Sequence, residues 1–581
     1  MKPALAIAVL FSAVSAQLPA AAPPAPRGTG GAISGAEASA AEAGLELLRE
    51  GGNAVDAAVA TALALAVVHP EAGNLGGGGF AVVKFGDEII TLDFREVAPA
   101  AAHRALYLDE DGTPIPEAST LGALAAGVPG SPHGYYQLHQ RFGARPWTQV
   151  VEPAHRLAAE GFPVSRRLHE SIDSNREKLS QFPSTAAVWL PAGAPPPIGS
   201  WMKLPALAAT LERYASEGPR AITTGPIAAA IERASLAGGG ILTAADLAAY
   251  EPVWRQPVRF TAFGWQFASM DLPSSGGIIL GQTLGLLERI SWRTEPRFGA
   301  ERAHLLAETW RRSFADRFLL GDPATSEANA DNLLAAAWLD RRASEIDRQR
   351  ATASDQVPTW GDSDRPLPQA EPTDTTHLAV VDGAGNVVSL TTTLNGSFGC
   401  GLLVPEAGFL LNNEMDDFAA APGEPNLYGL IQGEANAVRA GHRMLSSMTP
   451  TIAWNGTTVI AAGGRGGSRI PTATAQVLLN VIVDGDPLQQ AVNRPRLHHQ
   501  WLPDHIEADP DALSPETVTE LERRGHTVVT TGVPVKINAI RYQSNGQSGG
   551  LVEAAADPRG PGVGAVTRPE VTPSKAQGDR P

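Results

Sequence analysis

The first part of the chain carries hydrophobic residues at helical spacing, and the second part carries short apolar runs typical of strands. Residues 36–50 combine small and apolar residues with Glu in a helical pattern, and Gly51 and Gly52 end the run. Asn53 can cap a second helix over residues 54–68, which is apolar on nearly every side and is expected to be buried. Further helices are predicted at residues 104–108, 147–160, 204–215, 227–237, 278–289 and 300–319.

Strands are predicted where apolar runs are short and bounded by turn residues. Residues 80–85 and 88–94 flank Gly86-Asp87, which is a two-residue hairpin signal. Residues 351–374 are polar and Pro-rich, as expected of an exposed connector. Further strands are predicted at residues 258–263, 267–270, 375–381, 387–393, 451–454, 459–462 and 527–531. This order of elements predicts an α+β fold in stacked layers, with the strand-rich part last.

Both ends of the chain have the composition of segments outside the folded body. An N-terminal Met-Lys pair, an apolar run and then small residues predict a cleaved export signal over residues 1–16, and hence a periplasmic or secreted protein. The apolar run is too short to cross about 30 Å of hydrocarbon. Residues 17–30 are interpreted as a Pro- and Ala-rich linker, and residues 557–581 as a disordered tail rich in Pro, Gly and charge.

Composition narrows the possible classes of function. The 581 residues are 43% hydrophobic and 18% charged, which suits a globular protein with a large core. A formal net charge of −16 argues against a nucleic-acid partner, because such partners require clustered Lys and Arg. No later stretch is apolar enough to span a membrane stably. The single cysteine, Cys400, cannot form an internal disulfide and is predicted to be a core thiol.

A hairpin near the middle of the chain offers candidate chemistry. Residues 375–381 and 387–393 are rich in β-branched residues and flank a Gly-containing loop, and a symmetric loop places Thr375 opposite Thr393, with Asn395 on the same face. A threonine hydroxyl is a weak nucleophile, but a free α-amine on the same residue, with a pKa of roughly 7.7–8.0, could act as its base. Breaking the Asp374-Thr375 bond would free that amine. Taken alone, the hairpin fits two ordinary strands better than a catalytic site.

A series of motifs gives this hairpin a context. In order along the chain, they resemble the successive motifs of the γ-glutamyltransferase (γ-glutamyltranspeptidase) family and cover nearly the whole chain from about residue 31 to 559. Each motif is weak alone, but their joint order is highly specific. The motifs are Gly51-Gly52-Asn53-Ala54-Val55-Asp56-Ala57-Ala58, Gly76-Gly77-Gly78-Gly79-Phe80, Phe94-Arg95-Glu96, Gly127-Val128-Pro129-Gly130, Pro273-Ser274-Ser275-Gly276-Gly277, Phe314-Ala315-Asp316-Arg317, Asp374-Thr375-Thr376-His377, Thr393-Leu394-Asn395, Asn412-Asn413-Glu414-Met415-Asp416-Asp417-Phe418, Leu445-Ser446-Ser447-Met448 and Gly466-Gly467-Ser468-Arg469.

The resemblance implies an N-terminal-nucleophile hydrolase, a four-layer αββα sandwich built from both fragments of a self-cleaved precursor. The large fragment would be residues 31–374 and the small fragment residues 375–556, together forming a heterodimer. Thr375 would attack the carbonyl of Asp374 and would then serve as the catalytic nucleophile, oriented by Thr393. Neither a cofactor nor a metal is implied.

The resemblance also assigns a binding site for a γ-glutamyl group. Arg95, with Ser446 and Ser447, would bind the α-carboxylate, for which a guanidinium fork is well suited. Asn395, Glu414 and Asp417 would bind the α-ammonium. Taken without the motif order, the same residues fit a surface ion pair, a simple loop and a solvated acidic turn.

Two further segments complete the implied site. Gly466 and Gly467 would form an oxyanion hole, although Arg465 stands where the family usually has proline, which puts the loop geometry in question. His377 shares a strand face with Thr375 but is interpreted as structural. The Gly- and Pro-rich segment 419–443 is interpreted as a lid, with Tyr428 at the gating position.

The sequence therefore predicts an enzyme that cleaves γ-glutamyl amides such as glutathione through an ester on Thr375, and passes the acyl group to water or to an amino acid or peptide. Two alternatives stay open at this point. One is an acylase of the same fold, of the glutaryl-cephalosporin type, which would not need an ammonium site. The other is an uncleaved scaffold without catalysis.

Overall fold

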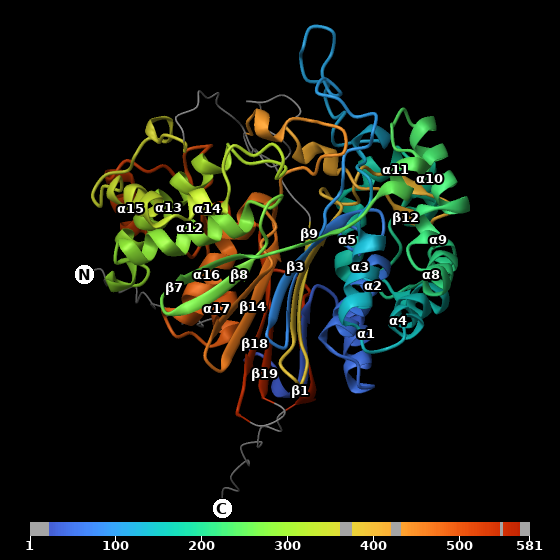
Figure 1. Cartoon of the computed structure of the whole chain (residues 1–581), viewed down its shortest axis with the longest axis horizontal. Coiled ribbons are helices and arrows are strands. Elements are labelled where there is room, and N and C mark those ends of the chain that lie inside the picture. Colours follow the sequence, from blue (N-terminus) through green and yellow to red (C-terminus); the bar gives the residue numbers. More distant parts are fainter. Residues whose placement is uncertain (1–22, 361–374, 420–431, 547–549, 570–581) are drawn as a thin grey trace, which may run out of the picture.

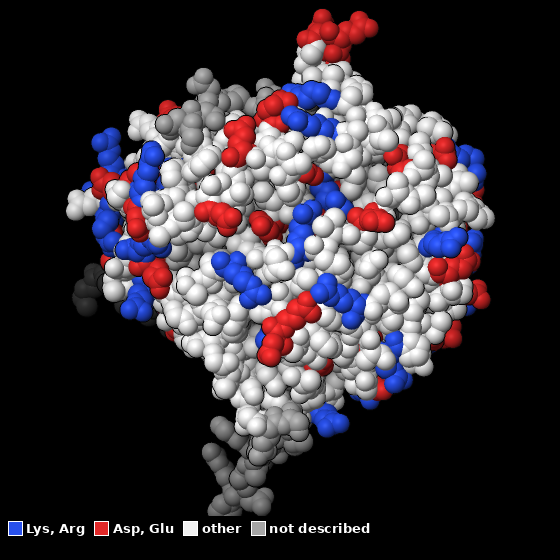
Figure 2. All heavy atoms as spheres, viewed as in Figure 1, with Lys and Arg blue, Asp and Glu red and all other residues white. Residues whose placement is uncertain are grey.

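The computed structural model describes residues 23–360, 375–419, 432–546 and 550–569. The predicted signal peptide, Asp374 and Tyr428 lie outside these ranges. No helix within them is both long and apolar enough to cross a membrane. On the face seen in Figure 2, acidic and basic side chains are interspersed and form no broad basic patch, which agrees with the acidic composition.

One antiparallel sheet of thirteen strands runs through the centre of the molecule (Figure 1). β20 (Val563–Pro569) lies off the main path and pairs with β1. The other strands follow the order β6 (Val253–Arg255), β3 (Glu88–Phe94), β2 (Gly78–Phe85), β10 (Val387–Thr393), β9 (Thr375–Val381), β1 (Arg27–Gly35), β19 (Leu551–Ala556), β18 (Lys536–Gln543), β14 (Thr458–Arg465), β13 (Thr451–Asn455), β8 (Trp265–Ser269) and β7 (Val258–Ala262).

Two groups of helices cover the outer faces of this sheet (Figure 1). The first group packs on β2, β9 and β10 and includes α1 (Ala38–Arg49), α2 (Ala54–Val68), α3 (Ser131–Phe142), α4 (Trp147–Glu160) and α8 (Pro205–Glu217). The second packs on β13, β14 and β18 and includes α12 (Gly276–Arg289), α13 (Ala300–Arg317), α16 (Ile470–Ile482) and α17 (Leu488–Asn493). The two hydrophobic cores lie on opposite sides of the molecule.

A third hydrophobic cluster lies between the two halves of the sheet. It joins Ala379 and Val387, from the β9–β10 hairpin, to Ala461 of β14 and Ile540 of β18. Because these strands belong to opposite halves of the hydrogen-bonded path, the sheet must fold over so that its halves pack face to face. Thr375 lies at the beginning of β9, at one end of this inner layer.

The helix α2 and the first hairpin match their predictions. Asn53 caps α2 in a reciprocal capping box with Asp56, and every residue of α2 is buried. The turn Gly86-Asp87 joins β2 and β3, and Gly86 adopts a positive φ of 58°, as a hairpin of this length requires. Cys400 is buried in the first core, and burial raises the pKa of its thiol to about 11, so it is an inert core residue.

Three predictions at the sequence level were wrong. Residues 104–107 form turns rather than a helix, because the chain folds back so that Leu108 bridges Pro114. The tail predicted from residue 557 contains β20, whose consecutive residues pair with β1, from Ala32 opposite Val566 to Gly35 opposite Val563. The predicted linker 17–30 overlaps β1, which begins at Arg27. In both cases the pairing partner is far away in sequence and composition alone could not reveal it.

Candidate active site

The β9–β10 hairpin brings two threonine hydroxyls together. Thr375 lies directly opposite Thr393, as the symmetric loop predicted, and their Oγ atoms are 3.5 Å apart. Both side chains are buried, with exposed fractions of 3% and 2%. A buried hydroxyl pair at the start of a strand can hold a nucleophile in one orientation, because neither side chain is free to rotate into solvent.

Asn395 connects this hydroxyl pair to the acidic loop. Its backbone N–H donates to Oγ of Thr393 at 2.8 Å, and its side-chain amide donates to the carbonyl of Asn413 at 3.0 Å. Asn395 has a φ of 73°, a left-handed conformation that asparagine adopts more readily than most residues. The chain therefore turns sharply after β10, and this turn places Asn395 beside the loop that carries Glu414 and Asp417.

A pocket with about 300 Å³ of empty space opens onto the two threonines. Most of the predicted site residues line this pocket, together with four residues for which no role was predicted. Of the predicted residues, Gly466 and Asn395 do not line it. The predicted members are Arg95, Thr375, Thr393, Glu414, Asp417, Ser446, Ser447 and Gly467. The members for which the motifs predicted no role are Arg317, Met448, Ser468 and Ile470.

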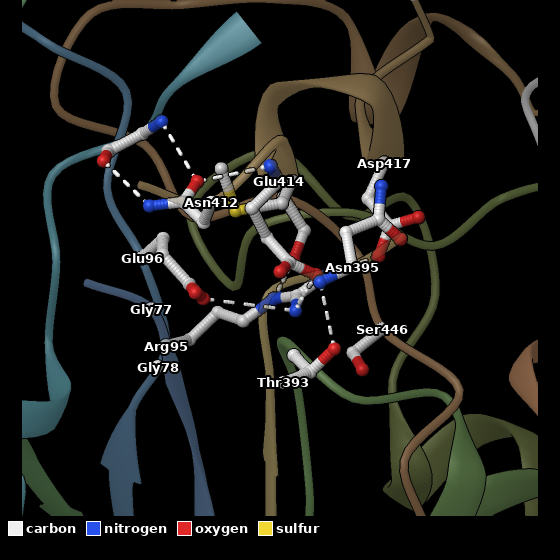
Figure 3. A network of polar contacts seen from close by, with 12 residues as sticks. Gly77, Gly78, Arg95, Glu96, Thr393, Asn395, Asn412, Glu414, Asp417 and Ser446 are labelled. Carbon is white, nitrogen blue, oxygen red and sulfur yellow. Dashed lines mark hydrogen bonds and ion pairs between the residues drawn. The ribbon is translucent and has the colours of Figure 1, made fainter. Parts of the chain in front are cut away.

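The guanidinium of Arg95 lies at the centre of a buried charge network (Figure 3). Its two terminal nitrogens pair with carboxylate oxygens of Glu414 and Asp417, and its Nε donates to the carbonyl of Met444 at 3.3 Å. Burial alone would lower the pKa of Arg95, but the neighbouring carboxylates outweigh burial and raise that pKa, so the group stays charged. The residues predicted to bind opposite charges of a ligand thus bind one another here.

Glu96, for which no role in the site was predicted, is fully buried beside Arg95. Its Oε2 lies 3.7 Å from Nη1 of Arg95, and burial raises its pKa to about 7. Burial also raises the pKa of Glu414 and of Asp417 above their ordinary values. Three carboxylates around one guanidinium therefore favour a retained proton at neutral pH. Gly78 makes room for Glu96, since a Cβ there would lie 2.5 Å from its Oε2.

Arg317 is a second buried guanidinium at the pocket. It comes from the last turn of α13, and its Nε donates to Oγ of Ser275 at 3.0 Å. Burial lowers its pKa to about 10, even though Asp417 opposes the shift. Arg317 lies in one of the motifs that resemble the family, but a helical pattern cannot show that the last turn of α13 reaches the pocket.

The two serines differ in their contacts. Ser446 is held in place by two hydrogen bonds to backbone groups. Its N–H donates to the carbonyl of Pro273 at 2.8 Å, and its Oγ accepts from the N–H of Met448 at 3.1 Å. The buried Oγ of Ser447 has no hydrogen-bond partner among the described residues. A buried hydroxyl without a partner is costly, so Ser447 is well suited to bind a polar ligand group in this pocket.

The glycine loop lies between the end of β14 and the beginning of α16. Gly466 has a φ of 139°, and a Cβ there would lie 2.9 Å from the backbone of Val535, so only glycine fits without strain. Gly467, with a φ of 56°, opens the short helical turn Gly467–Arg469. Arg465, which departs from the family pattern, pairs with Lys536 on β18, so the strand continues regularly up to the loop.

The contacts of His377 favour a structural role. Its Nδ1 lies 2.8 Å from Oγ of Thr391, and its ring covers Gly463, where a Cβ would lie 2.4 Å from Cε1. Burial lowers its pKa to about 3, so the ring is neutral at physiological pH. The ring therefore packs between the two halves of the sheet.

Comparison with known proteins gives consistent matches over nearly the full length. A family model described as gamma-glutamyltranspeptidase matches residues 40–567. The chain is 39% identical to a glutathione hydrolase proenzyme of Escherichia coli, over 96% of this chain and 97% of that protein. It is 41% identical to a glutathione hydrolase proenzyme of Pseudomonas aeruginosa, over 93% of this chain and 95% of that protein.

Solved structures give the same picture of the fold. Helicobacter pylori gamma-glutamyltranspeptidase is 36% identical, with a TM-score of 0.55, over 56% of this chain and 93% of that chain. A cephalosporin acylase from Bacillus halodurans superposes with a TM-score of 0.79, over 96% of this chain and 99% of that chain. The acylase is 24% identical, so that similarity concerns the fold alone.

Proposed function

Because this chain belongs to the gamma-glutamyltranspeptidase family, we propose that it cleaves γ-glutamyl amides such as glutathione, after cutting its own chain before Thr375. The acyl group passes through an ester on Thr375 to water or to the amine of an amino acid or peptide. One observation carries the proposal: the buried pair Thr375 and Thr393 shares a pocket with the charge network around Arg95.

Self-cleavage prepares the nucleophile. In the uncut chain, Oγ of Thr375 attacks the carbonyl carbon of Asp374, the C–N bond breaks, and the Thr375 nitrogen takes the proton that the hydroxyl loses. Water then hydrolyses the resulting ester and leaves a carboxylate on Asp374. The products are a large fragment, a small fragment that begins with Thr375, and an α-amine next to the hydroxyl.

The freed amine then acts as general base for the same hydroxyl. It takes the proton from Oγ as Oγ attacks the γ-carbonyl of the donor, and it returns that proton to the leaving amine as the C–N bond breaks. The N–H groups of Gly466 and Gly467 stabilise the negative charge that develops on the carbonyl oxygen. Water or an acceptor amine then attacks the γ-glutamyl ester, which restores the Thr375 hydroxyl.

Recognition of the donor rests on the charge network. The α-carboxylate binds Arg95 with Ser446 and Ser447, and the α-ammonium binds Glu414 and Asp417, with Asn395 supporting this side. A zwitterionic α-amino acid brings one charge of each sign, so it can replace the internal ion pairs without leaving a buried charge unpaired. A ligand that lacks either charge would leave such a group unpaired, which explains the preference for a γ-glutamyl group.

The mature assembly extends this proposal. The two fragments stay together as a heterodimer in a four-layer αββα sandwich of the N-terminal-nucleophile hydrolase type, supported by the two outer helical layers and the third cluster between the sheet halves. Residues 1–16 direct export to the periplasm or the medium, and the gating role of Tyr428 stays a prediction. An acylase for glutaryl substrates is less well supported, because it would not use the buried Glu414 and Asp417.

The direct test combines processing with activity. Purified protein should show two fragments on a denaturing gel, and sequencing should find a chain that begins Thr-Thr-His-Leu. The same sample should release the chromophore from a γ-glutamyl anilide but not from a glutaryl anilide. A single uncut chain, or equal activity on both anilides, would contradict the proposal.

Replacing Thr393 by Val should separate orientation of the nucleophile from binding of the donor. Valine has the shape of threonine but lacks the hydroxyl that lies 3.5 Å from Oγ of Thr375 and that accepts from Asn395. We expect slower self-cleavage and a kcat about 10-fold to 10²-fold lower, because a misplaced nucleophile reacts poorly. Steady-state kinetics on the cut fraction should find the KM for the donor within about twofold of wild type.

Replacing Gly466 by Ala should disturb the oxyanion site. The new Cβ would press on Val535 at 2.9 Å and would disfavour the φ of 139°, so the backbone N–H groups must move. Losing one such donor typically lowers kcat by about 10²–10³-fold. Gly456→Ala is the matched control, because Gly456 also has a positive φ, of 56°, but has open space around it. Equal kcat values for the two variants would exclude the assigned role.

A further inference from the structure

The strand β9 begins at the proposed nucleophile, Thr375. Among the described residues, its first part is paired with a strand on one side and not on the other. β10 pairs with all of β9, from Thr375 to Val381, whereas β1 pairs with β9 only from Ala379 to Val381. Among the described residues, no strand pairs with residues 375–378 on the side of β1. A strand edge without a paired neighbour tends to fray, so residues 375–378 need another contact on this side.

The side chain of Asn538 occupies this edge in place of a strand. Asn538 lies on β18, in the opposite half of the sheet, and its Nδ2 donates to the carbonyl of His377 at 2.7 Å. Its exposed fraction is 7%, so water competes little for this bond. Asn538 also pairs with Gly463, the residue that the His377 ring covers, so the two contacts fix His377 from the same direction.

The same contact reveals which way the backbone of Thr375 faces. Backbone groups of successive residues in a strand face opposite sides, and the N–H of Asp382 donates to Asn386 on the β10 side at 3.1 Å. The odd-numbered residues of β9 therefore face the other side, in agreement with the bond from His377 to Asn538. It follows that the nitrogen of Thr375 faces the vacant edge and that Thr375 and Thr393 form a non-hydrogen-bonded pair, in which side chains approach most closely.

A second cavity lies at this vacant edge. Its lining includes Thr376 and His377 of β9, Lys536 and Asn538 of β18 and Arg465 of β14, but not Thr375. The nitrogen of Thr375 faces the same edge of β9, where no strand among the described residues offers it a ladder of backbone hydrogen bonds. A nitrogen outside such a ladder is free to turn its lone pair toward Oγ once cleavage has made it an amine, so this strand phase suits a base at this position.

We propose that Asn538 is a positioning residue for the nucleophile, a role that rests on the proposed function. By holding the carbonyl of His377, it fixes the first residues of β9 in the phase that turns the Thr375 nitrogen to the vacant edge and its hydroxyl to Thr393. No strand is needed there, and so the amine is free after cleavage. Asn538 does not touch the donor, and its loss therefore leaves donor binding intact.

The test replaces Asn538 by Ala, which removes the bond, and by Asp, which keeps the shape but turns a carboxylate oxygen toward the carbonyl. Self-cleavage is followed on gels, and kinetics on a γ-glutamyl anilide are normalised to the fraction of chains that begin at Thr375. We expect slower cleavage and a kcat about 10-fold to 10²-fold lower for Ala, a larger loss for Asp, and KM within about twofold.

The matched control is Thr210→Val, which removes another buried side-chain bond to a backbone carbonyl, from Oγ of Thr210 to Ala407 at 2.8 Å in α8. This variant should lose stability and keep its kcat. Wild-type kcat in both Asn538 variants, with a Tm loss like that of the control, would overturn the inference. If Ala and Asp do not fold, Asn538→Ser is measured, and a kcat equal to that of the control overturns it. An inactive wild type would instead refute the proposed function.

Discussion

Replacing Thr375 by Ala is expected to yield one uncut chain without measurable activity. The variant lacks the hydroxyl that attacks Asp374, so neither the α-amine nor the ester can form. In a serine protease, which also works through a covalent acyl-enzyme, removing the nucleophile lowers kcat by about 10⁶-fold, and we expect a loss of similar size here. A denaturing gel, intact mass and a γ-glutamyl anilide assay on the same preparation measure both losses. An uncut variant with substantial activity would remove the mechanism.

Two control variants show whether this loss is specific to the hydroxyl of Thr375. Thr375→Ser keeps a hydroxyl and should still cut itself, with reduced kcat because serine lacks the methyl group that fixes the rotamer. Thr309→Ala removes another buried threonine, whose hydroxyl has no hydrogen-bond partner among the described residues, and it should be cut and active. If Thr309→Ala also stayed uncut, the effect of Thr375→Ala would reflect folding rather than chemistry.

Replacing Arg95 by Lys is expected to impair donor binding more than self-cleavage. Lysine keeps the charge that Glu414 and Asp417 require, but it cannot present a planar fork to a carboxylate. Bonds to charged groups contribute about 1.5–3 kcal/mol each, so losing one or two raises the KM for the donor by about 10–10⁴-fold. The measurement is the KM for a γ-glutamyl anilide, with the fraction cut determined on the same sample.

The control for Arg95→Lys is an arginine fork on the surface. Arg104 pairs with Glu434 through Nη2 at 3.1 Å, and both side chains are largely exposed, so Arg104→Lys should change neither KM nor processing. A KM for Arg95→Lys equal to that of Arg104→Lys would show that Arg95 does not bind the donor carboxylate. A larger loss with Arg95→Ala would not be informative, because it leaves buried carboxylates unpaired.

The sequence predicted the chemistry of the hairpin better than the chemistry of the pocket. The opposition of Thr375 and Thr393 follows from a two-residue period and a symmetric loop, which are local properties of the chain. The pairing of Arg95 with Glu414 and Asp417 joins positions 319 and 322 residues apart, and no local pattern encodes it. Arg317 and Glu96 were missed for the same reason, since their roles depend on which segments pack together.

The strand order affects how long the cut enzyme stays folded. Segments before and after the cut alternate across the sheet, so they meet at β2 with β10, at β9 with β1, at β1 with β19 and β20, and at β13 with β8. Cleavage of one peptide bond therefore leaves both fragments held in the same sheet. If the cut enzyme unfolds, however, two separate fragments must form this strand order again without the covalent link that joined them during the first folding. The working lifetime of the enzyme thus depends on slow unfolding rather than on refolding.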